Sequence, residues 1–383
     1  MIKAPSTISE NFFSWVHFGD LHIRDAQDDN YLDFVDLIEQ VNGHLAGEVD
    51  FAFLPGDNAD DGSEAQYMLV RKALATLNLP FHIITGDHDR KSGSLDLFRK
   101  YLESDLYRAA DLGSFRLLFL NAMDGTAANS FDFGSEQIDW LKAQLADARS
   151  KRYRPVVFTH LIRDFQAELV EMGHTHYNEL ANDGHTIYAA TRSTGQNEEG
   201  PPGFSFTTMD DDVVNWKFKE LGPWPFVMIT SPSDEKLITR PESLHHVVRG
   251  TIPIRAKVWG STMVAAVTCS IDNAPEQAME YAHGHWNVNW DSSQVPDGIH
   301  PVVVRVIQQG AGASDEISIL VNQAGHYTQP PRSDVDYENS IGAYPAKGIL
   351  GTQLGPNENG TKGPWPSWRG NPRRQPIRVR NEE

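Results

Sequence analysis

Five short motifs rich in aspartate and histidine each follow a run of apolar, β-favouring residues, and this pattern constrains the fold of the chain more than any other feature. The apolar runs are SWVHF, FAFL, FHII, PVVF and LVEM, and the motifs after them are GDLH, PGDN, TGDHD, THL and GHTH. Each run indicates a buried strand whose carboxyl end carries the motif. Helix-patterned sequence, YLDFVDLIEQV and YMLVRKALATL, fills the first two intervals and predicts a parallel sheet.

The carboxyl ends of parallel strands converge at one edge of a sheet, so the polar side chains of the motifs are expected to meet there. A single DxH, GD or HxH is more often a cap, a turn or a core histidine than a metal ligand. Five such motifs in order favour a site for two divalent metal ions instead. The candidate ligands are Asp20, His22, Asp57, Asp87, His160, His174 and His176.

This order of motifs resembles the calcineurin-like metallophosphoesterase family, whose pattern runs DxH, GDxxxD, GNH[DE], a later single His and GHxH. The resemblance covers roughly residues 12–220 and is nearest in pattern to the class III cyclic-nucleotide phosphodiesterase and glycerophosphodiesterase branch. It implies an α/β fold, a two-sheet sandwich flanked by helices. It also implies that Asp20, His22 and His176 bind the first metal and that Asp87, His160 and His174 bind the second. Asp57 would bridge the two.

The sequence departs from the family pattern at two places. Asp87 stands where the family has asparagine, which adds a negative charge and should strengthen the hold on a hard cation such as Mn²⁺ or Fe. The identity of the two divalent ions, Mn, Fe or Zn, stays open. The interval between His160 and His174 is shorter than usual for the family, which predicts that the segment covering the pocket is either short or partly missing from this chain.

Two adjacent cations can clamp a phosphoryl group and lower the pKa of a water so that hydroxide forms at neutral pH. The resemblance assigns His88 as the general acid that protonates the leaving group; the alternative is a histidine that supports the ligands or lies at the surface. Arg24 could bind a phosphate oxygen or pair with Asp25 or Asp28. Asn58 and Asn178 are candidates either for substrate binding or for support of the ligands.

Composition narrows the function further. The chain has 383 residues and a formal net charge of −19, which argues against a long nucleic-acid partner, because such binding needs Lys and Arg to neutralise phosphates. A small phosphorylated substrate fits better. The single cysteine, Cys269, excludes an intramolecular disulfide, and no apolar run reaches the roughly 20 residues of a membrane span. We therefore expect a cytoplasmic protein, although a mature exported protein would fit the same composition.

Changes in composition and residue pattern along the chain predict three parts. Residues 1–222 form the metallophosphoesterase domain, and the short β-like runs after GHTH predict its antiparallel half. Residues 223–322 alternate apolar and polar residues and predict a small all-β, immunoglobulin-like sandwich. Residues 323–383 predict an irregular Pro/Gly/Arg-rich arm, either docked on its own or a neighbouring subunit or disordered. A homo-oligomer through the sandwich and arm is one expectation, and assembly of the metal site by residues 1–222 alone is another.

The function predicted is dinuclear, metal-dependent hydrolysis of phosphate esters, through metal-activated hydroxide with His88 as general acid. A phosphodiesterase acting on a small substrate such as a cyclic nucleotide or a glycerophosphodiester is favoured. A phosphomonoesterase with the same metal centre is the nearest alternative. A surface-binding protein with a degenerate metal domain is a further one, but a decayed site would have lost ligands.

Overall fold

The structure is a computed structural model, and it describes residues 12–350 except 125–130, 162–164, 166, 196–199, 261–263, 309–310 and 329–338. The part of the predicted arm from residue 351 onward, including GPWPSWRGNPRRQP, lies outside the described residues.

The first sheet holds the strands that precede the first three motifs. Its order is β11 (Val213–Glu220), β10 (Gly203–Asp210), β1 (Phe12–Phe18), β2 (Phe51–Leu54) and β3 (Phe81–Ile83). β1, β2 and β3 are parallel, as the sequence predicts, and β1 pairs antiparallel with β10 on its other side. The helices α1 (Asp29–His44) and α2 (Glu64–Leu74) make the crossovers between these parallel strands, and the short α3 (Asp96–Tyr101) follows β3.

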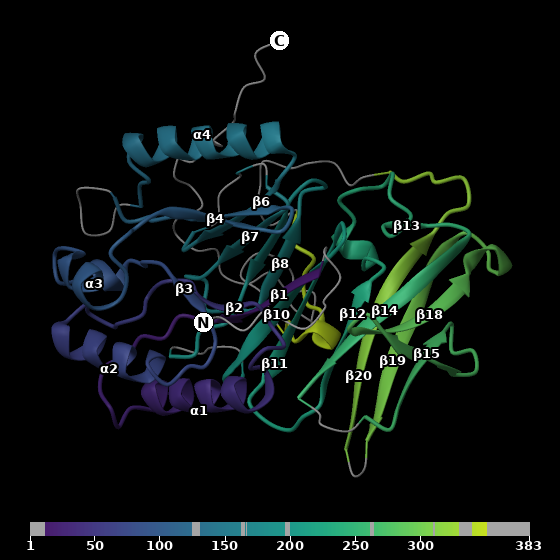
Figure 1. The fold of residues 1–383 in the computed structure, drawn as a ribbon, viewed down its shortest axis with the longest axis horizontal. Coiled ribbons are helices and arrows are strands. Elements are labelled where there is room, and N and C mark those ends of the chain that lie inside the picture. The colour runs from purple at the N-terminus through teal and green to yellow at the C-terminus, as the bar shows by residue number, and fades with distance from the viewer. Residues whose placement is uncertain are drawn as a thin grey trace.

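The second sheet carries the last two motifs. Its order is β4 (Arg108–Leu112), β5 (Phe115–Phe119), β6 (Arg154–Thr159), β7 (Leu169–Met172), β9 (Ile187–Ala190) and β8 (Glu179–Asn182). β5, β6, β7 and β9 are mutually parallel. The helix α4 (Ser135–Lys151) connects β5 to β6, and Figure 1 shows it on the opposite side of the molecule from α1 and α2.

The core lies in three layers between these elements. Large aromatic side chains fill the space between the two sheets, among them Trp15 and Phe53 of the first sheet and Phe158 of the second. A second cluster joins the first sheet to α1 and α2, and a third joins the second sheet to α4. The two sheets flanked by helices that the resemblance implies are therefore present.

The strands after GHTH are distributed differently from the prediction. They were expected to form one antiparallel half of the sandwich, but β9 runs parallel to β7 within the second sheet, whereas β10 and β11 return to the first. The physical reason is the exposed edge of β1. β10 covers that edge with an antiparallel ladder from Phe12 to Phe18, which satisfies backbone groups that would otherwise be unpaired.

Two further sheets follow residue 222 and share one apolar core. One contains β12 (Phe226–Ser231), β14 (Thr251–Trp259), β18 (His285–Asp291) and β17 (Glu280–Ala282). The other contains β13 (Val247–Val248), β20 (Ala311–Val321), β19 (Gly298–Gln308), β15 (Ala266–Ile271) and β16 (Gln277–Ala278). The region is thus an all-β sandwich; its likeness to immunoglobulin modules and the domain boundaries stay predictions. Short 3₁₀ turns lie at His88–Arg90, Glu235–Leu237, Ser292–Gln294 and Pro345–Lys347.

The sandwich and the first sheet are in direct contact. Phe206 of β10 stacks on Phe226 of β12 with ring centroids 4.5 Å apart. The ring of Trp259 of β14 lies 4.8 Å from that of Phe206. Farther along the chain, Ile349 is fully buried in the core between the two amino-terminal sheets. Among the described residues, no helix is both long enough and apolar enough to cross a membrane.

These contacts predict that residues 1–222 do not fold as stably as the longer chain. Ending the chain at residue 222 removes Phe226, Trp259 and Ile349, and each buried side chain of this kind stabilises the fold by about 1.5–3 kcal/mol. We expect a lower melting temperature or a loss of cooperative unfolding in calorimetry. A chain ending at residue 350 keeps every described contact and serves as the control. Equal melting temperatures for the two chains would contradict the prediction.

Candidate metal centre

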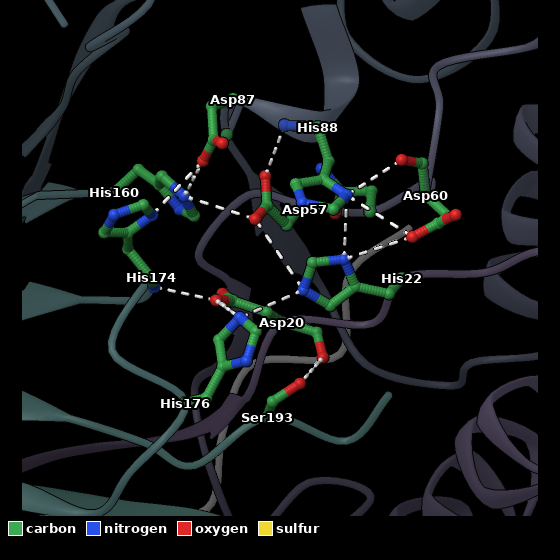
Figure 2. A network of polar contacts seen from close by, with 12 residues as sticks. Asp20, His22, Asp57, Asp60, Asp87, His88, His160, His174, His176 and Ser193 are labelled. Atoms are coloured by element: carbon green, nitrogen blue, oxygen red, sulfur yellow. Dashed lines mark hydrogen bonds and ion pairs between the residues drawn. The ribbon is translucent and has the colours of Figure 1, made fainter. Parts of the chain in front are cut away.

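The seven predicted ligands meet at one end of the two sheets. They lie just after the carboxyl ends of β1, β2, β3, β6 and β7, and Figure 2 shows their side chains turned toward one another. They divide into two groups of four that share one residue. One group is Asp20, His22, Asp57 and His176, and the other is Asp57, Asp87, His160 and His174. The ligand atoms within each group lie within 4.8 Å of one another.

In the first group, imidazole and carboxylate atoms point into a common space. His22 Nε2 lies 3.2 Å from His176 Nε2 and 3.7 Å from Asp57 Oδ2. His176 Nε2 lies 3.6 Å from Asp20 Oδ2. Two imidazole nitrogens and two carboxylates that converge in this way are suited to hold a cation that all of them can bind.

In the second group, Asp87 Oδ1 is 3.2 Å from both His160 Nε2 and His174 Nδ1. His160 Nε2 also lies 3.5 Å from Asp57 Oδ2, the same oxygen that faces His22. The other nitrogen of His160, Nδ1, is 2.9 Å from the carbonyl oxygen of Pro55. That bond requires a proton on Nδ1, so Nε2 is the nitrogen of this ring that is available to bind a metal.

The backbone around the cluster is held in unusual conformations. Four of the seven residues have positive φ although none is glycine: His22 (47°), Asp57 (49°), His174 (69°) and His176 (62°). Such conformations cost free energy and persist only where the surroundings enforce them. Glycine is required beside them, since a Cβ on Gly86 would lie 2.2 Å from Asp57 Oδ1. The strained backbone at these residues therefore directs their side chains into the cluster.

The donor set fits a divalent cation. Asp20 is almost completely buried, and while its Oδ2 accepts a hydrogen bond from the His174 amide at 2.7 Å, its Oδ1 has no hydrogen-bond partner in the described part of the chain. A buried carboxylate oxygen without a partner is costly, and a cation would satisfy it. Carboxylate oxygens with imidazole nitrogens suit Mn²⁺, Fe and Zn²⁺. The cluster and the resemblance together indicate divalent metal ions, of unassigned identity.

The protonation equilibria point the same way. Burial raises the pKa of Asp20 to about 8, and the neighbouring Asp57 and Asp87 carboxylates add to the rise. Burial lowers the pKa of His22 to about 3, which keeps its imidazole neutral and able to bind a metal. Burial also disfavours the charged form of Asp57. The positive charge of His160 and its hydrogen bond favour that form more strongly, so the pKa of Asp57 is lowered. Closely packed buried carboxylates of this kind are stabilised by positive charge between them.

His88 lies against the first group (Figure 2). Its Nδ1 is 2.8 Å from the backbone oxygen of Asp60 and 3.1 Å from His22 Nδ1, and its amide donates to Asp57 Oδ1 at 2.8 Å. Its Nε2 is 2.8 Å from Nζ of Lys91, whose side chain is exposed. The place fits the predicted general acid, although His22, Asp60 and His88 also form a third group of potential ligands.

Two residues that contact His88 were not predicted from the sequence. Asp60 and Lys91 both contact His88, and each stands three residues after a candidate site residue, Asp60 after the candidate ligand Asp57 and Lys91 after the candidate acid His88. Their proximity to the motifs was the available signal. Nothing in the sequence distinguished them from the other charged residues of the same loops.

The three candidate substrate contacts are engaged elsewhere. Arg24 is exposed and its Nε donates to Asp28 at 2.6 Å, which is the surface pairing given as the alternative. Asn58 is fully buried and its Nδ2 donates to the Ile84 backbone and to Asp89, both at 2.9 Å. Asn178 is also fully buried and binds backbone groups on both sides. For the two asparagines, burial and these bonds favour the alternative of support for the loops, and substrate binding by either stays a prediction.

Comparison with known proteins supports the family resemblance. Residues 14–178 match the family model described as calcineurin-like phosphoesterase. All seven clustered residues fall within this segment, and the resemblance predicted from the motifs is confirmed over it.

Curated relatives match over part of their length. A glycerophosphodiester phosphodiesterase, GpdQ, from Enterobacter lignolyticus is 31% identical over 157 residues, which is 38% of this chain and 55% of the relative. A probable cyclic nucleotide phosphodiesterase from Fibrobacter succinogenes is 28% identical over 135 residues, 33% of this chain and 50% of the relative. The chain thus spans about half the length of these relatives.

Among solved structures, a dimetal phosphatase from Danio rerio aligns with 55% of this chain and 96% of its own, at 13% identity and a TM-score of 0.47. A likeness at this level supports no conclusion about substrate.

The shared position of Asp57 predicts that Asp57→Ala is the most damaging single change. Because its carboxylate faces both groups, its loss should reduce bound metal from two ions to fewer than one per chain, as measured by elemental analysis after gel filtration. Asp183→Ala, which removes another buried aspartate that accepts backbone hydrogen bonds, should keep both ions. Two retained ions in Asp57→Ala would show that Asp57 is not shared.

A separate prediction concerns the departure at Asp87. Replacing it with Asn removes one negative charge beside His160 and His174, so the affinity of the second site for Mn²⁺ should fall while the first site changes less. The fold should survive, because Asn is nearly isosteric. Calorimetric titration of both proteins with Mn²⁺ measures this, and superimposable titrations would rule out an effect of the charge.

Proposed function

We propose that this chain, whose residues 14–178 match the calcineurin-like phosphoesterase family, hydrolyses phosphate esters at a centre of two divalent metal ions and acts on small phosphodiesters. The observation that carries the proposal is the pair of ligand groups joined at Asp57. A site with one carboxylate shared between two groups, each with two imidazoles, is suited to hold two cations close together, as a two-metal hydrolysis of phosphate esters requires.

Asp20, His22, His176 and Asp57 would hold one ion, and Asp57, Asp87, His160 and His174 the other. When bound, the ions would supply positive charge to the phosphoryl oxygens and lower the pKa of a water nucleophile. The protein contributes the rest: imidazole and carboxylate ligands, of which His22 is kept neutral by burial, loops fixed by positive-φ residues, and His88 beside the first group.

His88 is proposed to protonate the leaving oxygen. Its Nδ1 lies 2.8 Å from the Asp60 carbonyl, which can only accept a hydrogen bond, so the transfer would occur at Nε2. An ester with an alkoxide leaving group depends on this proton, whereas an aryl oxide can leave without it.

A phosphodiester is favoured over a monoester because both curated relatives described above carry phosphodiesterase names. Glycerophosphodiesters and cyclic nucleotides are the two small-substrate classes in those names. A phosphomonoesterase is the second candidate, because the same ligand set serves either reaction. A panel of purified monoesters, glycerophosphodiesters and cyclic nucleotides, assayed with Mn²⁺ or Zn²⁺, separates them: turnover of monoesters alone would reject the diesterase proposal.

The acid role predicts an effect that depends on the leaving group. General acid catalysis typically contributes about 10²–10⁴-fold, so His88→Ala should lose roughly that factor on an alkyl diester and much less on a nitrophenyl diester. Both ions should remain bound. His185→Ala, which changes an exposed histidine outside the cluster, is the control. Equal losses on both esters would reject the acid role, and loss of an ion would make His88 a ligand.

A further inference from the structure

A segment near the end of the described chain lies along the edge of the second sheet. This segment comprises residues 339–349, and its first part, residues 339–341, pairs with β8, which is the last strand of that sheet. The backbone amide of Asn182 donates to the backbone carbonyl of Asn339 at 2.8 Å, and the backbone amide of Ile341 donates to the backbone carbonyl of Leu180 at 3.0 Å. A bridge between Ala181 and Ser340 lies between these bonds. The segment therefore continues the sheet and covers backbone groups that β8 would otherwise expose.

Two buried anchors fix the far end of this segment. Ile349 is fully buried between the two amino-terminal sheets. Lys347 is also fully buried, with Nζ 3.4 Å from both carboxylate oxygens of Asp315 on β20. Asp315 lies 2.9 Å from Lys217 Nζ on β11 as well. Because an unpaired buried charge is costly, these ion pairs hold the segment, the sandwich and the first sheet in one arrangement.

Between these anchors, the segment touches the loop that carries His176. Asn178 stands two residues after His176 and is fully buried. Its Nδ2 donates to the carbonyl of Gly348 at 2.8 Å, and its Oδ1 accepts from the amide of Arg192 at 2.9 Å. The side chain of Asn178 thus ties the His176 loop to two separate stretches of backbone.

The second of those stretches leads to Asp20. Ser193, next to Arg192, donates its hydroxyl to the backbone oxygen of Asp20 at 2.8 Å, as Figure 2 shows. The amides of Thr194 and Gly195 donate to the same oxygen at 3.0 Å each. Asp20 and His176 are therefore linked through Asn178 and the turn at 192–195. The carbonyl of Gly348 holds the Asn178 side chain in this link from the carboxyl-terminal segment.

We propose that the Asn178–Gly348 contact is a positioning device by which residues 339–349 set the geometry of the first metal site. The inference rests on the proposed metal centre and concerns only one half of it. Asp20 and His176 belong to the first group, whereas in the second group the His160 ring is held by the Pro55 carbonyl. His174 meets the first group through its backbone amide, which donates to Asp20 Oδ2, while its ring faces Asp87. The left-handed backbone at His176, φ 62°, is the kind of conformation that such a contact must maintain.

The test is metal affinity in the full chain carrying Asn178→Ala. Mn²⁺ titration with competition by a chelator gives the two dissociation constants. The dissociation constant that is lost in His176→Ala is the one that belongs to the first site. Removing a partner that orients a metal ligand typically weakens affinity about 10–100-fold. We expect that loss at the first site and less than a threefold change at the second.

Asn182→Ala is the matched control. Asn182 lies four residues farther along the same edge, and its Nδ2 also donates to backbone carbonyls, those of Lys236 at 2.9 Å and Ile238 at 3.0 Å. It should lower the melting temperature and leave both dissociation constants unchanged. If Asn178→Ala leaves both constants unchanged, or weakens both sites equally, the positioning role is wrong.

A second variant approaches the same contact from the other side. Gly348 has φ +81°, and a Cβ there would lie 2.8 Å from Phe218 Cβ, so Gly348→Ala should displace the carbonyl while Asn178 stays intact. Selective weakening of the first site is again expected, and unchanged affinities would overturn the proposal even if Asn178→Ala fails to fold. A wild-type chain that binds no metal would contradict the proposed function instead, so the two failures are distinguishable.

Discussion

Three carboxylates packed among four imidazoles, around the single carboxylate of Asp57, are the interaction on which the rest of the structure depends. Buried like charges repel in a medium of low dielectric constant, and in this cluster the pKa of Asp20 is raised while that of Asp57 is lowered. Such an arrangement gains free energy from positive charge at its centre. It would be hard to explain as packing alone, because apolar side chains of similar size would be more stable there.

The fold brings these groups together by locking the two sheets to each other through a buried acid. Glu171 of β7 lies in the layer between the sheets, where its carboxylate is 2.7 Å from His17 Nδ1, 3.2 Å from Trp15 Nε1 and 2.5 Å from Thr207 Oγ1. His17 stands three residues before Asp20, and Glu171 stands three before His174. A polar contact inside an otherwise apolar layer fixes which strand ends face each other, and a cluster drawn from both sheets needs that registration.

Much of this could be predicted from the sequence, because it depends on local pattern. Apolar runs followed by a motif with an acid or a histidine predicted the strands and their ligand-bearing ends, and the family resemblance assigned Asp57 to both metal groups. Long-range contacts could not be predicted. The sequence does not show that Asn178 bonds to Gly348, 170 residues away, or that β10 returns to cover β1. For Asn58, the choice between substrate and support depended on burial, which single-residue chemistry does not determine.

The central claim, that seven side chains hold two ions and share Asp57, is tested most directly by anomalous diffraction from crystals grown with Mn²⁺. The account predicts two anomalous peaks per chain. One should lie among Asp20, His22 and His176, the other among Asp87, His160 and His174, with Asp57 oxygens reaching both. A single peak, or two peaks of which one does not touch Asp57, would contradict it.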